Sequence, residues 1–326
     1  METLLEVKDL RVAFHQRDSI IHAVNGISYT LHKGETIGLV GESGCGKTVS
    51  SMSMLKLLSM PPGKIESGSI MFENADLVPM DQAKLRSYRG KEIGVIFQDP
   101  MTSFNPVMSI GDQMIEGYRE HFKASKKEAL AQAQKLLEQV GIPAAASRLR
   151  DYPSRFSGGM RQRVMIAIAL SCNPKLLIAD EPTTALDVTI QAQILRLLKS
   201  LQQQTQTAIL LITHDLGVVA QVCSRVVVMY GGLVMEEGSV EDIFYRPAHP
   251  YTQGLLASLP RPNEVNHRLS PIEGSPPGLL NPPPGCPFAE RCPKRMAQCE
   301  RRPAFYAIGE GHRAACWLWA DKEIQA

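Results

Sequence analysis

The segment Gly41-Glu42-Ser43-Gly44-Cys45-Gly46-Lys47-Thr48 decides the fold. It matches the pattern G-x-x-x-x-G-K-[ST], follows an apolar run at 35–40 and precedes a helical pattern that begins at Lys47. Glycines let consecutive backbone N–H groups curl around a phosphate, and the start of the following helix adds its positive dipole end. Lys47 would reach the β- and γ-phosphates of a nucleotide, and the Thr48 hydroxyl would bind Mg²⁺. We therefore expect a phosphate-binding loop.

A second motif places two carboxylates at the end of a buried strand. Four apolar residues, 176–179, precede Asp180 and Glu181. The carboxyl ends of strands in open α/β sheets form the edge where ligands bind. On its own, the pair is more often two solvated carboxylates at a strand end. Beside a phosphate loop, we expect Asp180 to hold Mg²⁺ and Glu181 to orient and deprotonate an attacking water.

A third motif, Ser157-Gly158-Gly159, opens an apolar helix. A serine followed by two glycines makes another helix start that suits an anion. One nucleotide rarely needs two such sites in one chain, so this motif alone would be interpreted as a simple helix cap.

The remaining pattern alternates strands with helices. Expected strands lie at 4–14, 23–31, 35–40, 68–72, 93–98, 175–180, 208–213 and 226–230, and expected helices at 47–58, 125–140, 161–170 and 191–204. Ser125 and Glu128 have the spacing of a capping box. This alternation predicts an α/β fold with a mostly parallel sheet covered on both faces, interrupted by a helical insert.

Composition limits the classes of function. The chain has 326 residues, 44% of them hydrophobic and 21% charged, as in a globular protein with a sizeable core. The net charge of +2 gives no general basic field, so no nucleic-acid partner is expected. No apolar run reaches the roughly 18 residues that a membrane span needs, and the acidic N-terminus does not resemble a signal peptide.

The C-terminal part has an unusual composition. Thirteen of the 22 prolines lie between Pro247 and Pro303. Four of the seven cysteines, Cys286, Cys292, Cys299 and Cys316, lie in the last 41 residues. Without a secretion signal, these cysteines are better interpreted as metal ligands or free thiols than as disulfides.

In their order and spacing, the motifs of residues 4–240 resemble those of the ATP-binding cassette (ABC) ATPases. The first two motifs resemble Walker A and Walker B. Residues 156–160 (FSGGM) resemble the signature LSGGQ, from which Phe156 and Met160 depart. Four more positions match family motifs: the Q-loop Gln98, the D-loop Ala185–Asp187, the switch histidine His214 and the adenine-stacking Phe14.

The resemblance implies an ABC ATPase fold. It would have a RecA-like, mostly parallel sheet core, an antiparallel β subdomain, a helical signature subdomain at about 99–163 and a small Cys-rich C-terminal extension. We expect the nucleotide-binding domain at 1–246 and the extension at 247–326.

The resemblance also implies that two cassettes dimerise head to tail around two ATP molecules. Residues acting within one cassette would be Phe14, the loop Gly41, Glu42, Ser43, Gly44, Cys45, Gly46, Lys47 and Thr48, and Gln98, Asp180, Glu181 and His214. Thr48, Gln98 and Asp180 would hold Mg²⁺. Ser157, Gly158, Gly159 and Asp187 would act across the dimer interface.

The C-terminal part resembles the oligopeptide/dipeptide importer branch of this family, through His249-Pro250-Tyr251-Thr252 and the four spaced cysteines. This implies an ATP-hydrolysing subunit on the cytoplasmic face of the membrane. Its partners would be a sister ATPase or a second copy, two membrane-spanning permease subunits and, indirectly, an extracytoplasmic solute-binding protein. Two alternatives remain: an importer subunit for nickel or another small solute, and a soluble ABC ATPase acting on nucleic acid or ribosomes.

Four thiolates could hold an iron–sulfur cluster or zinc. Members of this branch with such an array are thought to carry a [4Fe–4S] cluster, which we expect at Cys286, Cys292, Cys299 and Cys316. Zinc is the alternative, although the spacings lack the C-x2-C typical of zinc ribbons.

Overall fold

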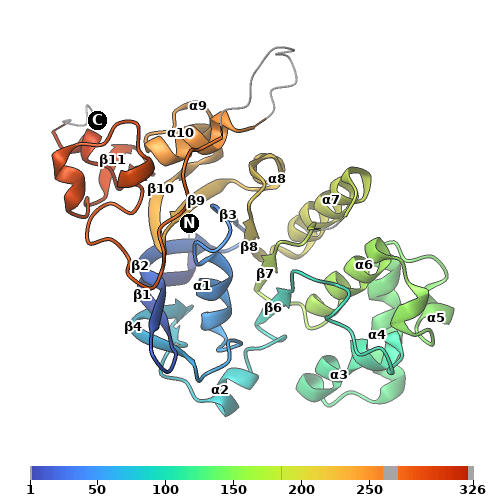
Figure 1. Cartoon of the computed structure of the whole chain (residues 1–326). Helices are drawn as coiled ribbons and strands as arrows, with labels where there is room; N and C mark the ends of the chain where they lie inside the picture. The colour runs from blue at the N-terminus through green and yellow to red at the C-terminus, as the bar shows by residue number, and fades with distance from the viewer. Residues whose placement is uncertain (1, 185, 260–270, 322–326) are drawn as a thin grey trace. The chain divides into compact units, whose positions relative to one another are not determined.

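The computed structural model describes residues 2–184, 186–259 and 271–321. The chain forms two compact units (Figure 1). Unit 1 comprises Met1–Leu4, Leu31–Thr36 and Pro79–Thr213, and unit 2 comprises Leu5–Thr30, Ile37–Val78 and His214–Ala326. None of the described helices is long and apolar enough for a membrane span.

Unit 1 contains three parallel strands in the order β8 (Ala208–Thr213), β7 (Leu176–Asp180) and β6 (Ile93–Ile96). Every residue of β7 and β8 is buried, as their continuous apolar sequences predict. The helix α7 (Val188–Thr205) follows β7 and leads back to β8. The predicted strand–helix–strand unit is therefore confirmed.

The helical insert is also confirmed, and its helices lie together in one part of unit 1 (Figure 1). They are α3 (Ile110–Phe122), α4 (Lys126–Gln139), α5 (Ala145–Arg148), the 3₁₀ turn η1 (Pro153–Arg155) and α6 (Gly158–Ala169). The short helix α2 (Gln82–Arg86) precedes β6 and is not part of the insert. The capping box forms as predicted, because Ser125 accepts from the Glu128 N–H and the Glu128 side chain accepts from the Ser125 N–H.

Unit 2 contains a four-stranded sheet in the order β2 (Ile20–His32), β1 (Thr3–His15), β4 (Gly63–Phe72) and β5 (Ala75–Asp76). The pairs β1–β4 and β4–β5 are antiparallel. This matches the antiparallel β subdomain that the family resemblance implies.

A second group of strands in unit 2 runs in the order β11 (Tyr306–Gly309), β12 (His312–Ala314), β10 (Leu233–Ser239), β9 (Arg225–Tyr230) and β3 (Thr36–Val40). The pair β3–β9 is parallel, and the other pairs are antiparallel. The helices of this unit are α1 (Lys47–Met54), α8 (Leu216–Val222), α9 (Val240–Tyr245) and α10 (Pro250–Ala257), with the 3₁₀ turns η2 (Ala289–Arg291), η3 (Ala297–Glu300) and η4 (Trp317–Trp319). The cysteine-rich extension thus adds strands to the sheet that carries β9.

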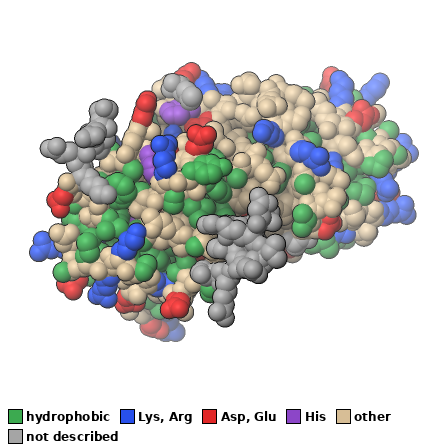
Figure 2. Space-filling view, turned by 90° about the horizontal axis from the view of Figure 1, so that it is seen from above, with side chains coloured by type: hydrophobic (Ala, Val, Ile, Leu, Met, Phe, Trp, Pro, Cys, Tyr) green, Lys and Arg blue, Asp and Glu red, His purple; other side chains and the backbone are tan. Residues whose placement is uncertain are grey.

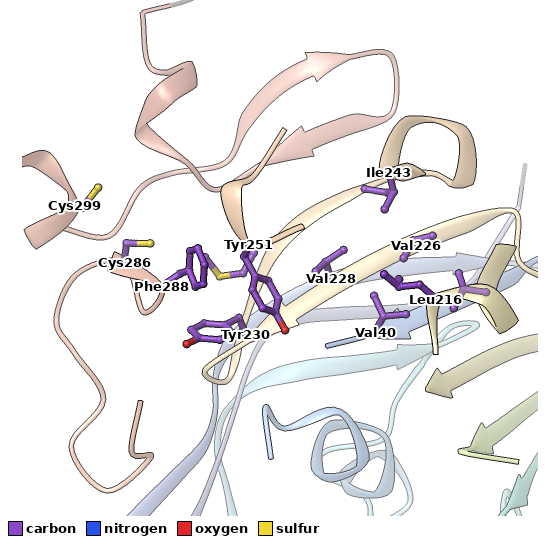
Figure 3. Close-up of a cluster of buried hydrophobic side chains, with 12 residues drawn as sticks. Val40, Leu216, Val226, Val228, Tyr230, Ile243, Tyr251, Cys286, Phe288 and Cys299 are labelled. Carbon is purple, nitrogen blue, oxygen red and sulfur yellow. The ribbon is translucent and has the colours of Figure 1, made fainter. Parts of the chain in front are cut away.

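Viewed from above, the surface shows hydrophobic side chains with acidic and basic side chains interspersed around them (Figure 2). Tyr245 and Leu280 are two exposed apolar side chains of unit 2. Below the surface, Tyr230, Tyr251 and Phe288 belong to one buried cluster that joins β9, α10 and the extension (Figure 3).

The buried carboxylate of Glu236 in β10 binds the extension at three points. It accepts hydrogen bonds from the Ala248 N–H at 2.7 Å and from the His249 N–H at 2.9 Å. It also pairs with His312 Nε2 at 2.8 Å. His249 caps α10, because its Nδ1 accepts from the Tyr251 N–H at 3.0 Å. Burial lowers the pKa of His249 from 6.5 to about 4, although the negative charge of Glu236 favours the protonated form and opposes this shift.

This shift predicts acid sensitivity. The folded pKa of His249 lies below the ordinary value, so the unfolded chain binds more protons between pH 6.5 and 4. The free energy of unfolding should therefore fall by up to about 3 kcal/mol across that window. His249→Asn keeps a capping side chain and should flatten this dependence in urea unfolding at several pH values. The control is His15→Asn at the exposed end of β1, and equal flattening in both variants would contradict the assignment.

Candidate nucleotide-binding site

The loop between β3 and α1 has a backbone that only glycine accommodates at two positions. Gly41 has φ +152°, and a Cβ there would lie 2.1 Å from the Met229 carbonyl oxygen. Gly46 has φ +99°, and a Cβ there would lie 2.3 Å from the Ala23 carbonyl oxygen. The loop is thus seated on the backbones of β9 and β2, which fixes its path.

The loop presents positive charge at the start of α1. Gly46 stands at the N-cap of α1 and contributes no side-chain cap, whereas serine and aspartate side chains cap α6 and α7. Lys47 Nζ donates to the Gly41 and Glu42 carbonyl oxygens at 2.7 and 3.0 Å, so the ammonium lies within the loop. Burial raises the pKa of the Cys45 thiol, although Lys47 opposes this, and the thiol stays protonated at neutral pH. The helix dipole and the ammonium together suit an anionic ligand.

In unit 1, the end of β7 carries the predicted acids. Asp180 is buried, and Glu181 has a left-handed φ of +45° that its N–H stabilises by donating to the Ile212 carbonyl oxygen at 2.8 Å. Glu181 Oε2 accepts from Gln98 Nε2 at 2.9 Å and from Thr184 Oγ1 at 2.8 Å. The structure therefore brings the side chains of Gln98 and Glu181 together. The sequence did not identify Thr184 as a site residue, because the only indication in the sequence is a hydroxyl side chain three residues after Glu181.

The third motif and the D-loop position also lie close together in unit 1. Ser157 caps α6 by accepting from the Met160 N–H at 3.3 Å, and Asp187 caps α7 by accepting from the Ile190 N–H at 2.9 Å. A Cβ on Gly159 would lie 2.9 Å from Ile190 Cγ2, so the starts of α6 and α7 are in contact. The D-loop residue Ala185 lies outside the described residues.

The other predicted residues lie in unit 2. Phe14 is partly exposed in β1 and pairs with Gly63 of β4, where a Cβ would lie 3.3 Å from its ring. His214 directly follows β8 in the chain. Phe14, the phosphate loop and His214 thus belong to unit 2, whereas Gln98, Asp180, Glu181, the third motif and Asp187 belong to unit 1.

Two side chains beyond the motifs contact the phosphate loop from within unit 2. The Tyr251 hydroxyl accepts from the Glu42 N–H at 2.9 Å, and Arg291 donates to both oxygens of the Glu42 carboxylate, at 2.7 and 3.1 Å. Tyr251 stands in the segment that suggested the importer branch, but the sequence linked neither residue to the loop.

The expected metal site at the four cysteines is not supported. The Cys286 N–H donates to the Cys299 carbonyl oxygen at 2.9 Å, so these two segments are adjacent. Burial, followed by repulsion from the other three thiolates, raises the pKa of Cys286 to about 11. The Cys286 and Cys299 thiols, however, point in different directions within the apolar cluster (Figure 3). Among the described residues, no three Cys, His, Asp or Glu side chains form a group that could hold a [4Fe–4S] cluster or zinc.

Comparison with known proteins matches two family models to this chain. The model described as ABC transporter matches residues 24–184, and the model described as oligopeptide/dipeptide transporter, C-terminal region, matches residues 235–299. The first range contains the phosphate loop and both acids. The second begins in β10 and includes three of the four clustered cysteines.

Similar curated proteins extend over almost the whole chain. The dipeptide transport ATP-binding protein DppD of Bacillus subtilis is 52% identical, over 98% of this chain and 95% of that protein. The oligopeptide transport ATP-binding protein OppD of Bacillus subtilis is 53% identical, over 97% and 88%. OppD of Escherichia coli is 48% identical, over 97% and 93%.

Solved structures show the same fold. The ATP-binding cassette MJ0796, in a dimeric post-hydrolysis state with ADP and phosphate, aligns with a TM-score of 0.65 at 25% identity, over 72% of this chain and 98% of that one. CbiO1 of Clostridium perfringens, part of an ABC transporter complex, aligns with a TM-score of 0.62 at 29% identity, over 76% and 92%.

The two glycines of the third motif should respond differently to alanine. Gly159→Ala should lower the free energy of unfolding by about 1–3 kcal/mol, because its methyl group would collide with Ile190. Gly158→Ala is the matched control, since no atom lies within 4 Å of a Cβ there. Urea unfolding of both variants checks this, and equal destabilisation would show that the Gly159–Ile190 contact is not what restricts this position.

Proposed function

The chain belongs to the ABC transporter ATP-binding proteins, in the branch of the dipeptide and oligopeptide transport subunits, and from this we propose that it hydrolyses ATP to energise peptide import. The observation that carries the proposal is that the relatives match along almost the whole chain. The match includes the extension as well as the cassette. A likeness restricted to the cassette would indicate an ABC ATPase without indicating what it energises.

Within one cassette, we propose that the phosphate loop and Lys47 bind the triphosphate of ATP and that Phe14 stacks on its adenine. Glu181 would take a proton from the attacking water. The hydrogen bonds from Gln98 and Thr184 support this role, because they hold the Glu181 carboxylate in one orientation. His214 would contact the γ-phosphate.

The oxygen donors available suit Mg²⁺, which would be held by Thr48, Gln98 and Asp180. Hydroxyl, amide and carboxylate oxygens are the hard ligands that this ion prefers. Bound there, Mg²⁺ would neutralise charge on the phosphates. We assign no metal to the four cysteines, because their thiols form no metal-holding group among the described residues.

We propose that the working form is a head-to-tail dimer, with a second copy or a sister subunit. Ser157, Gly158, Gly159 and Asp187 would then contact the nucleotide held by the other cassette. The dimer would dock on two membrane-spanning permease subunits at the cytoplasmic face, and an extracytoplasmic solute-binding protein would deliver the peptide. Support comes from the dimeric cassette among the structural relatives and from the named roles of the transport relatives.

Replacing the proposed base tests the chemistry. Glu181→Gln should bind ATP but release phosphate about 10²- to 10⁴-fold more slowly, because the amide cannot accept the water's proton. Glu138→Gln makes the same chemical change on the exposed face of α4 and is the control. Phosphate release by the purified complex measures both, and near-normal turnover of Glu181→Gln would reject it as the base.

Reconstitution tests the transport role. The intact membrane complex, purified with its permeases and placed in liposomes with its solute-binding protein, should take up dipeptides or oligopeptides only with ATP. Uptake should disappear with Glu181→Gln and persist with Glu138→Gln. A subunit that co-purifies with ribosomes or nucleic acid, rather than with permeases, would refute the proposal.

A further inference from the structure

Arg291 joins the cysteine-rich extension to the phosphate loop. It donates to Glu42 Oε2 at 2.7 Å, to Glu42 Oε1 at 3.1 Å and to the Tyr230 hydroxyl at 3.0 Å. It also donates to the carbonyl oxygens of Ile272 and Glu273, at 3.1 and 2.9 Å. A guanidinium has five N–H groups, and all five are used here. Its orientation is therefore fully determined by its surroundings.

The pair between Arg291 and Glu42 is shielded from water. The Arg291 side chain is only 7% exposed and that of Glu42 is 23% exposed. The guanidinium lies 5.6 Å from the ring centroid of Tyr230 and 6.0 Å from that of Phe288. A bidentate pair in such surroundings is stronger and more directional than a surface ion pair, and removing one partner leaves a poorly solvated charge.

Tyr251 holds the same loop residue through its backbone. Its hydroxyl accepts from the Glu42 N–H, and its fully buried ring lies 4.5 Å from Tyr230 and 5.3 Å from Phe288 (Figure 3). His249 caps the helix that carries Tyr251. The position of the hydroxyl is thus set by α10 and by the apolar cluster.

Glu42 links these contacts to the nucleotide lysine. Its side chain and N–H are held by Arg291 and Tyr251, while its carbonyl oxygen accepts from Lys47 Nζ. The loop is rich in glycine, and such a backbone loses much conformational freedom when it adopts one shape. Contacts that fix Glu42 in advance reduce the entropy that nucleotide binding would otherwise cost.

We propose that Arg291 and Tyr251 are positioning residues that hold the phosphate loop ready for a nucleoside triphosphate, so that the extension sets the affinity of the cassette for its nucleotide. The inference rests on the proposed ATPase function. Neither residue would contact the nucleotide; both would act through Glu42.

The test measures binding of a fluorescent ATP analogue to the full-length chain. Arg291→Met should raise the dissociation constant about tenfold, and Tyr251→Phe, which removes only the accepting hydroxyl, should raise it by a smaller factor. Lys294→Met is the matched control, because it removes a cation three residues away that bonds Gln253 instead of the loop. This control should bind like the wild type.

A double-mutant cycle separates loop positioning from general stability. In a Glu42→Gln background, Arg291→Met should weaken binding much less than in the wild type, because the ion pair is already lost. In the purified complex, Arg291→Met should raise KM for ATP and change kcat less than about twofold. Arg291→Lys keeps the positive charge but lacks the planar guanidinium, so its KM for ATP should lie between those of the wild type and Arg291→Met.

Each result decides one question. Unchanged nucleotide affinity in folded Arg291→Met and Tyr251→Phe would overturn the inference. It would also be overturned if Arg291→Met weakened nucleotide binding equally in the wild-type and Glu42→Gln backgrounds. If Arg291→Met does not fold, judged by thermal unfolding without nucleotide, Arg291→Lys and Tyr251→Phe decide. A wild-type chain that binds no ATP analogue would instead refute the proposed function.

Discussion

The structure depends on the close seating of the phosphate loop against two strands. Gly41 and Gly46 bring the loop so near to the carbonyl oxygens of Met229 and Ala23 that a single methyl group would not fit. This contact joins β3, β9 and β2 around the start of α1. Two side chains elsewhere in unit 2 restrict the same loop, because Tyr251 of α10 and Arg291 of the extension form hydrogen bonds with Glu42.

The sequence predicted the parts of the fold that local patterns encode. The apolar runs of β7 and β8 and the capping box of α4 appear where expected, because each reports burial or hydrogen bonding within a few residues. The predicted helix after the loop was longer than α1, which ends at Met54. The strands β11 and β12 were missed because they are short and rely on distant partners, such as the pair between His312 and Glu236.

The residues of the candidate site also fall into those that local motifs predict and those that depend on distant contacts. Motif order predicted the loop, Gln98 and Glu181, and the structure places the last two within hydrogen-bonding distance. Thr184 and Arg291 could not be predicted, because their importance comes from where their side chains end in space. The cysteine spacings predict four converging thiols, and among the described cysteine segments the structure shows a backbone hydrogen bond only between those of Cys286 and Cys299. The spacings carried no information on the directions of the sulfur atoms, and the metal site that they suggested has no support among the described residues.

The distance in sequence between Glu42 and Arg291 has a consequence for synthesis. The two residues are 249 positions apart, and the phosphate loop is translated first. A nascent chain therefore carries every nucleotide motif before the arginine that holds Glu42 has been made. The hydrogen bonds from Arg291 to Glu42 can form only after residue 291 has been synthesised, and a chain truncated before it would contain all the nucleotide motifs without these bonds.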